Sequence, residues 1–171
     1  FAAAQAAELI VMGRGSGRTW RDTFLGSTAE RVMRTARLPV LAVRLAPRGP
    51  YHQPAMAIDL DEAAPRVVDW LLRLVPPPRP RLEVLHAFRA PFENLLYPSL
   101  PREDLEERRA ELRHDASIQL AGILTQALAR AGLAPGEIRW KVHVRHGSAR
   151  TVIAKAVKQS QFDLLVLGTH G

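Results

Sequence analysis

Short, mostly apolar runs alternate with helical stretches along this chain, and this alternation constrains its fold more than any other feature. The first two runs, residues 8–13 (ELIVMG) and 39–44 (PVLAVR), flank a helical stretch from about residue 27 to residue 35. Runs of this length and composition are typical of strands that helices cover on both faces of a sheet. We therefore predict an α/β fold in which crossover connections produce a parallel sheet between helical layers.

The same alternation continues after residue 54. The predicted strands are residues 55–59, 81–88, 138–144 and 162–168, and the predicted helices are residues 62–75, 102–132 and 148–160. In the longest of these helices the apolar residues follow helical spacing in the second half, so we expect its first half to be more exposed. Residues 89–101 predict a loop whose apolar content suits a flap or a contact surface.

An internal repeat points to two domains. Residues 8–13 match residues 163–168 at an offset of 155 positions, which is the length of a domain. Residues 45–54 hold three prolines and a glycine, as is typical of a linker. We accordingly expect residues 1–44 to be the C-terminal part of a first domain and residues 55–171 to be a second domain that lacks its last helix and strand. The chain would then be a fragment, or the ordered part, of a protein with two domains of about 150 residues each.

Composition narrows the class of protein. The 171 residues are 47% hydrophobic and 24% charged, which is typical of a globular domain and excludes a disordered chain. No apolar run reaches the ~18 residues of a membrane span, and no signal peptide is evident. The absence of cysteine excludes disulfides, thiolate nucleophiles and cysteine-based zinc sites. We expect a cytoplasmic protein.

The net charge of +7 favours an anionic partner. Residues 1–54 alone carry eight arginines against three acidic residues. A nucleic acid is not the expected partner, because cations and acids are interspersed and the aromatic residues form no stacking cluster. Two explanations of the positive charge remain: it binds a phosphate-bearing ligand, or it is a basic surface without a specific partner.

Many α/β proteins bind a phosphate where a strand is followed by glycines and then by a helix. Here the strand ends at Gly13, and the next helix starts at Gly26, Ser27 and Thr28, where free N–H groups and the helix dipole would hold an anion. The loop matches neither the ATPase loop, nor the dinucleotide fingerprint, nor the nucleophile elbow. The structural alternatives are a plain connecting loop and a capping box of Ser27 with Glu30.

Asp59 ends an apolar strand, and a carboxylate at that position suggests a binding role. Ligands of open parallel sheets bind beyond the carboxyl ends of the strands, so Asp59 suits a ribose hydroxyl or an adenine amino group. Alternatively, Asp59 caps the following helix together with Asp61 and Glu62. The histidines are scattered, and His143 and His146 would point to opposite faces of a strand, so we expect neither a metal site nor a catalytic triad.

Several of these segments, in this order, resemble the universal stress protein family. LIVMG, followed after twelve residues by GSTAERVMRTARLPVLAVR, resembles the end of a domain of that family, whose motif is Gly-x2-Gly-x9-Gly-Ser/Thr. FDLLVLGTHG resembles the start of the same motif in a second domain. AMAIDLDEAA resembles the family's first strand, and LEVLHAF with APFE resembles its second strand and exit. The sequence departs from the motif at Ser16, which stands where the second glycine should be.

The resemblance implies an open five-stranded parallel sheet of strand order 3-2-1-4-5 with helices on both faces, as in adenine-nucleotide alpha-hydrolase-like proteins. It also implies binding of ATP or AMP, with or without Mg²⁺, and no metal site of the protein's own. By this resemblance Asp59, His86 and Ala87 would face adenine and ribose. The phosphates would meet Gly13, Ser16, Gly26, Ser27 and Thr28 in the first copy of the motif, and Gly168 and Gly171 in the second.

Members of the family are frequently dimers or tandem repeats, so the resemblance implies a homodimer or a pair of domains within one chain, without a membrane. Residues 1–44 would be either the remnant of a separate domain or the helix and strand that complete residues 55–171. The expected function is a nucleotide-binding regulatory module of the stress response. We do not expect this protein to be an enzyme. Slow ATP hydrolysis would need a general base and a carboxylate that binds magnesium, and neither is identifiable in the sequence. A dimerisation or interaction module without nucleotide, and an adenylate-handling or flavoprotein-like enzyme domain, are the alternatives.

Overall fold

The computed structural model describes residues 6–13, 27–44, 46, 48–90 and 101–168. The chain divides into two compact units, residues 1–49 and residues 50–170. The division falls inside the proline-containing stretch of residues 45–54.

The first unit consists of two strands and the helix between them: β1 (Ile10–Gly13), α1 (Ser27–Thr35) and β2 (Val40–Val43). The two strands pair in parallel along the whole length of each. Parallel neighbours need a crossover connection, and α1 lies where the sequence predicts a helix. None of the described residues of this unit is buried. The described part of the unit therefore holds no hydrophobic core of its own.

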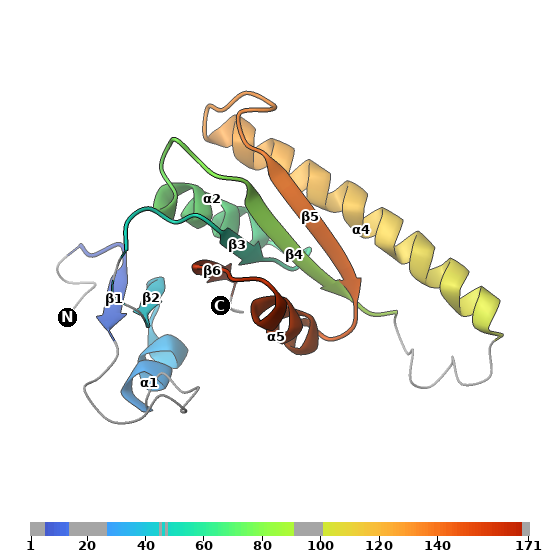
Figure 1. Ribbon diagram of the computed structural model, residues 1–171, viewed down its shortest axis with the longest axis horizontal. Helices are drawn as coiled ribbons and strands as arrows, with labels where there is room; N and C mark the ends of the chain where they lie inside the picture. The colour runs from blue at the N-terminus through green and yellow to red at the C-terminus, as the bar shows by residue number, and fades with distance from the viewer. Residues whose placement is uncertain (1–5, 14–26, 45, 47, 91–100, 169–171) are drawn as a thin grey trace. The chain divides into compact units, whose positions relative to one another are not determined.

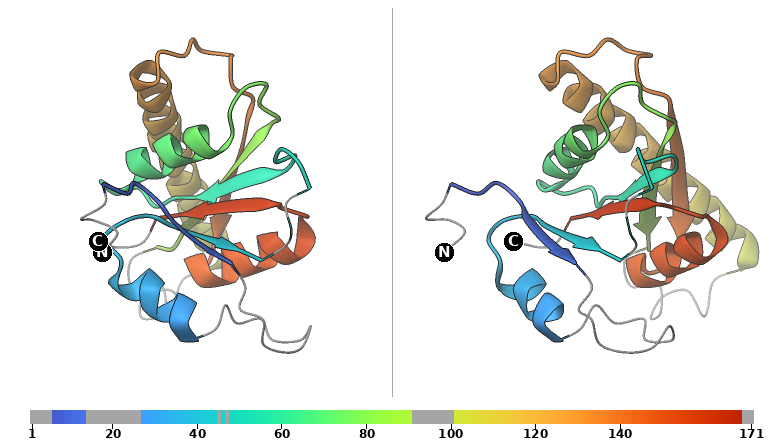
Figure 2. Two further views of the ribbon diagram at one scale, coloured as in Figure 1. Left: turned by 90° about the vertical axis from the view of Figure 1, so that its left-hand side faces the viewer. Right: turned by 60° about the vertical axis from the view of Figure 1, so that its left-hand side comes forward.

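The second unit contains, within its described residues, β3 (Pro54–Ala57), α2 (Ala64–Leu74), β4 (Leu82–Phe88), α4 (Arg102–Arg130), β5 (Trp140–His146), α5 (Ala149–Gln159) and β6 (Leu164–Leu167). The four strands are parallel and follow the order β5-β4-β3-β6 (Figure 1). Helices α2 and α4 lie side by side on one face of this sheet, and α5 lies on the other (Figure 2).

The predicted α/β class with a parallel sheet is confirmed. The strand order within the second unit is 3-2-1-4 when its strands are numbered along the chain. The five-stranded sheet of order 3-2-1-4-5 is not what the described residues form, because they make a four-stranded sheet in this unit and a two-stranded sheet in the first.

Strand register determines which side chains form the core. Met56 of β3 lies opposite Val84 of β4 and Val166 of β6, so these three side chains share one face of the sheet. The largest fully buried side chains come from the sheet and from α2 and α4: Met56, Leu71, Leu82, Leu120, Val68 and Val84. Full burial of a side chain of this size contributes about 1.5–3 kcal/mol. The core therefore lies between the sheet and these two helices.

Helix α2 has clear local reasons for both of its ends. The Oδ1 atom of Asp61 accepts hydrogen bonds from the backbone N–H groups of Ala63 (2.9 Å) and Ala64 (3.2 Å), which the start of a helix leaves without partners. Pro65 occupies the first turn, where its missing N–H costs nothing. Three prolines at residues 76–78 prevent the helix from continuing.

Helix α4 is buried only along its second half, as the sequence predicts. Its buried residues are Ala116, Leu120, Leu124, Ala127 and Leu128. The helix ends with a left-handed residue, Gly132 at φ +68°, after which the N–H of Leu133 donates to the carbonyl of Leu128 at 3.0 Å. This turn leads the chain back toward β5.

Candidate functional site

The order of the strands creates a switch point between β3 and β6. From β3 the chain proceeds through β4 to β5 at one edge of the sheet, and it then returns to place β6 on the other side of β3. The helices on the two sides of this point lie on opposite faces of the sheet, α2 on one and α5 on the other. In open parallel sheets, a crevice for ligands forms beyond the carboxyl ends of the strands at such a point.

Asp59 lies at this switch point. Ala57 at the end of β3 pairs with Leu167 at the end of β6, so Asp59 follows two residues beyond one strand end and Gly168 follows directly after the other. Asp59 is exposed, and its Oδ1 accepts a hydrogen bond from the N–H of Leu60 at 2.8 Å. Within the described residues this carboxylate makes no other hydrogen bond or ion pair.

The alternative in which Asp59 caps the following helix is not what the structure shows. Asp61 bonds the first N–H groups at the start of α2, whereas Asp59 bonds only its immediate neighbour. The Asp59 carboxylate therefore keeps acceptor capacity for a ligand.

Gly168 is an exposed residue on the other side of the switch point. A Cβ atom built on Gly168 would lie 3.1 Å from the Cγ2 atom of Val67 in α2. That distance is shorter than ordinary van der Waals contact, so glycine allows the end of β6 to lie close against α2. The second glycine of this copy of the motif, Gly171, lies outside the described residues.

His86 and Ala87 lie near the end of β4, the neighbour of β3. The side chain of His86 is buried, with 4% of its surface exposed, and its Nδ1 atom lies 3.0 Å from the carbonyl oxygen of Ile58. The N–H of Ile58 in turn donates to the carbonyl of Leu85 at 3.0 Å. Ala87 is half-buried. His86 thus belongs to the core and holds the backbone directly before Asp59.

The remaining predicted phosphate residues belong to the first unit. Gly13 is the last residue of β1 and is exposed, and a Cβ atom built on it would meet no atom within 4 Å. Ser27 and Thr28 form the start of the α1 backbone, while their side chains, together with Ser16 and Gly26, lie outside what the structure describes. The structure therefore brings Asp59, His86, Ala87 and Gly168 together at one end of one sheet, while Gly13, Ser27 and Thr28 belong to the other unit.

A polar cluster that sequence reasoning did not find lies on β4 and β5. Glu83 accepts a hydrogen bond from the Nε2 of His143 at 2.8 Å and one from the Nζ of Lys141 at 3.3 Å, and Arg81 lies 3.9 Å away. Partial burial raises the pKa of Glu83, but the hydrogen bonds and charges of His143 and Lys141 outweigh it and hold that pKa below its ordinary value. The only signal in the sequence was an acid inside a strand.

Neither a metal site nor a membrane span is found in the part of the chain that the structure describes. No group of three or more histidine or acidic side chains there could hold a metal ion. No helix among those residues combines the length and the apolar character needed to cross a membrane.

The fold and the site define a class: an open parallel α/β protein with an available carboxylate and a glycine at its switch point. The sequence profile of the universal stress protein family matches residues 1–44 and residues 51–171. The chain belongs to the universal stress protein family. A search of curated protein sequences found no match.

Two solved structures are similar in fold to nearly the whole chain. A protein named as a universal stress protein from Pseudomonas aeruginosa UCBPP-PA14 is 17% identical with a TM-score of 0.59, and 99% of this chain aligns with 55% of that one. A functionally unknown protein from Pseudomonas aeruginosa PAO1 is 18% identical with a TM-score of 0.58, over 99% of this chain and 54% of that one. The chain thus spans about half the length of both proteins.

Proposed function

We propose that this protein is an adenine-nucleotide-binding regulatory module that takes ATP or AMP, with or without Mg²⁺, at the switch point between β3 and β6. The proposal rests on the placement of Asp59, an exposed carboxylate with spare acceptor capacity, beside Gly168 at the carboxyl ends of adjacent parallel strands. Family membership supports it, because the resemblance implies adenine nucleotides at the corresponding residues.

In this proposal Asp59 accepts a hydrogen bond from a ribose hydroxyl or from the adenine amino group, both of which can donate. Ala87 lies at the neighbouring strand end and contacts the sugar or base. His86 acts through Ile58, because its buried ring holds the backbone that carries Asp59. His86 is then a positioning residue, while direct contact with the nucleotide is assigned to Asp59 and Ala87.

The phosphates meet backbone N–H groups at Gly168 and Gly171, where the absence of a side chain permits close approach. In the other copy of the motif the corresponding groups are Gly13, Ser16, Gly26, Ser27 and Thr28. Binding alone is proposed, because no catalytic base is assigned. We further propose that the module is cytoplasmic and acts as a homodimer or as part of a tandem pair of domains, and that nucleotide occupancy changes the surface it presents.

The experiment measures bound and added nucleotide separately. The purified chain is denatured, and released small molecules are identified by mass spectrometry; ATP and AMP are then titrated into nucleotide-free protein by calorimetry. The expected result is an adenine compound in the released fraction and saturable binding of ATP or AMP. Recovery of no adenine compound together with no heat of binding would leave the protein as an interaction module, the function that Ser16 in place of a motif glycine favours.

A further inference from the structure

The outer edge of β5 is an unpaired strand edge in the part of the chain that the structure describes. β5 lies at one end of the sheet, and each of its seven residues pairs with β4 on the inner side. A strand in this position presents outward-facing N–H and C=O groups that can pair with another extended segment. Seven residues are enough for such pairing, since strands of about five to six residues are the commonest.

A groove of about 580 Å³ runs beside this edge, between α4 and β5. On the helix side its lining includes three small residues spaced four apart, Ser117, Ala121 and Thr125, together with the larger Arg113, Leu124 and Leu128. On the strand side it is lined by Trp140, Val142 and Val144, which alternate along β5 and so share one face. Small residues opposite an apolar strand face leave room for the side chains of an added strand.

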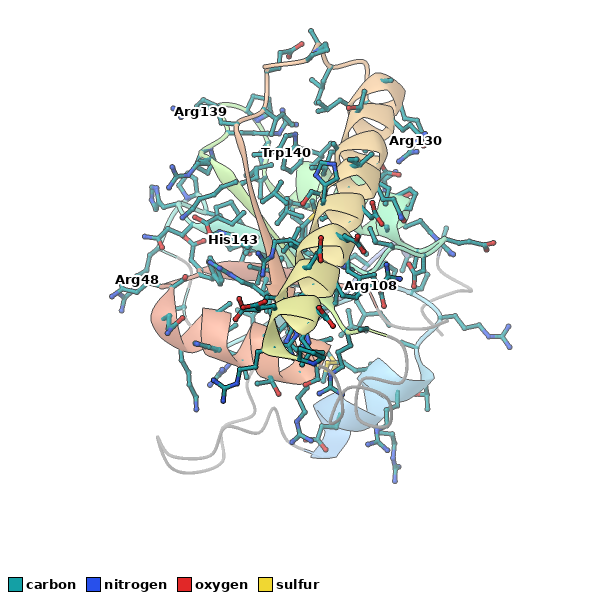
Figure 3. The ribbon with its side chains drawn as sticks, turned by 90° about the vertical axis from the view of Figure 1, so that its right-hand side faces the viewer. Arg48, Arg108, Arg130, Arg139, Trp140 and His143 are labelled. Carbon is teal, nitrogen blue, oxygen red and sulfur yellow. The ribbon has the colours of Figure 1, made fainter. Side chains whose placement is uncertain are left out.

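Val142 and Trp140 have unusual surroundings among the residues that line the groove. Val142 is 42% exposed, which is unusual for a valine in a strand beneath a helix layer. The Nε1 atom of Trp140 is buried and has no hydrogen-bond partner within the described residues; Figure 3 shows this side chain beside α4. An added segment would cover the exposed surface of Val142.

The charge around the edge selects the chemistry of the occupant. From residue 138 to residue 162 the sequence has six cationic residues and no acid: Arg139, Lys141, Arg145, Arg150, Lys155 and Lys158. Lys141 shares Glu83 with His143, but neither Arg145 of β5 nor Arg113 of α4, which both line the groove, makes an ion pair among the described residues. Two such edges would repel one another, because pairing them places like charges side by side. Charge complementarity therefore favours an acidic segment over a second copy of this chain.

We propose that the β5 edge and the α4–β5 groove form a strand-addition site for an extended protein segment in which apolar and acidic residues alternate. Backbone hydrogen bonds to the edge supply affinity, and the apolar side chains enter the groove. The acidic side chains, which alternate with the apolar ones along the segment, pair with the cationic Lys141 and Arg145 of β5. This site is distinct from the switch point and does not depend on nucleotide binding.

The test uses the full chain and a fluorescein-labelled peptide of seven residues, the length of β5, that alternates glutamate with valine. Fluorescence anisotropy is expected to show saturable binding. A peptide with lysine in place of glutamate, and one N-methylated on every second backbone nitrogen, are each expected to bind at least ~10-fold more weakly. Equal binding of the N-methylated peptide would overturn strand addition.

Variants distinguish binding in the groove from attraction by the overall positive charge. Ala121→Trp fills the groove and Arg145→Glu reverses the edge charge, and both are expected to weaken binding by ~10-fold or more. Arg66→Glu, an equal charge reversal at an exposed residue of α2, is expected to leave it unchanged. Thr125→Trp, also at an exposed position, is the alternative groove-filling variant if circular dichroism shows that Ala121→Trp does not fold. Wild-type affinity in the folded groove-filled variant, or tighter binding of single-stranded DNA with the same dependence on Arg145, would overturn the proposal.

Discussion

The Nδ1 atom of His86 lies 3.0 Å from the carbonyl oxygen of Ile58, the residue directly before Asp59. A carbonyl oxygen can only accept a hydrogen bond, so Nδ1 carries the proton in this contact. Because the ring is buried, the contact joins the core to the backbone at the carboxyl end of β3. The position of the Asp59 carboxylate thus depends on a side chain that is itself inaccessible.

Replacement of His86 tests this dependence. We expect His86→Leu to lower the free energy of unfolding by about 1–3 kcal/mol, because the buried carbonyl of Ile58 loses its partner. Urea denaturation measures this loss, and nucleotide affinity is expected to fall as well. His114→Ala, at an exposed position of α4, is the control and should change neither quantity. An unchanged stability in the His86 variant would show that the hydrogen bond does not support the strand end.

Asp59→Asn is expected to weaken binding of ATP or AMP by about 10-fold, equivalent to about 1.4 kcal/mol, because the amide is a poorer acceptor than the carboxylate. Stability should change by less than about 0.5 kcal/mol, since Asp59 is exposed and asparagine can still accept from Leu60. Titration calorimetry and thermal unfolding measure the two effects. Glu62→Gln removes an equal charge from a nearby exposed residue and should leave affinity unchanged; the same loss in both variants would point to net charge instead.

Gly168→Ala is expected to destabilise the fold by about 1 kcal/mol, because the new methyl group would lie 3.1 Å from Val67. The physical cause predicts coupling between the two residues. In a Val67→Ala background the methyl group that clashes is absent, so the added cost of Gly168→Ala should disappear. A double-mutant cycle of unfolding free energies measures the coupling, and additive effects would show that the close contact relaxes without cost.

The lowered pKa of Glu83 predicts how the free energy of unfolding depends on pH. Its pKa is lower in the folded protein than the ordinary value of 4.5, so the unfolded chain binds the proton more tightly. The group therefore stabilises the fold above pH 4.5, and this contribution is lost as the pH falls through the lowered pKa. We expect wild type to be more stable than Glu83→Gln at pH 6 and the difference to narrow below pH 4.5. A difference that stays constant between these conditions would contradict the role of His143 and Lys141 in holding the carboxylate charged.

Local pattern in the sequence is enough to predict the elements of this fold. The predicted helix at residues 148–160 forms at Ala149–Gln159, and the predicted strand at 81–88 forms at Leu82–Phe88. Helical spacing, apolar runs and prolines act over a few residues, so they can be recognised without knowledge of the rest of the chain. The same applies to the parallel arrangement, since a crossover helix between strands dictates it. The sequence also predicts that Asp59 and Gly168 lie at the ends of strands, because strand ends are visible in the pattern, and the structure places them there.

Contacts between elements were decided only by the tertiary structure. Asp163 accepts hydrogen bonds from the N–H groups of His52 and Gln53 at 2.6 Å and 3.0 Å, and Glu83 bonds His143 across 60 positions. Burial of His86 and the groove beside Trp140 depend on the same kind of information. Strand order and register determine which distant residues meet, and neither leaves a periodic signal along the chain. The sequence by itself determined where the strands and helices form, while the packing of those elements determined which side chains became buried, paired or available to a ligand.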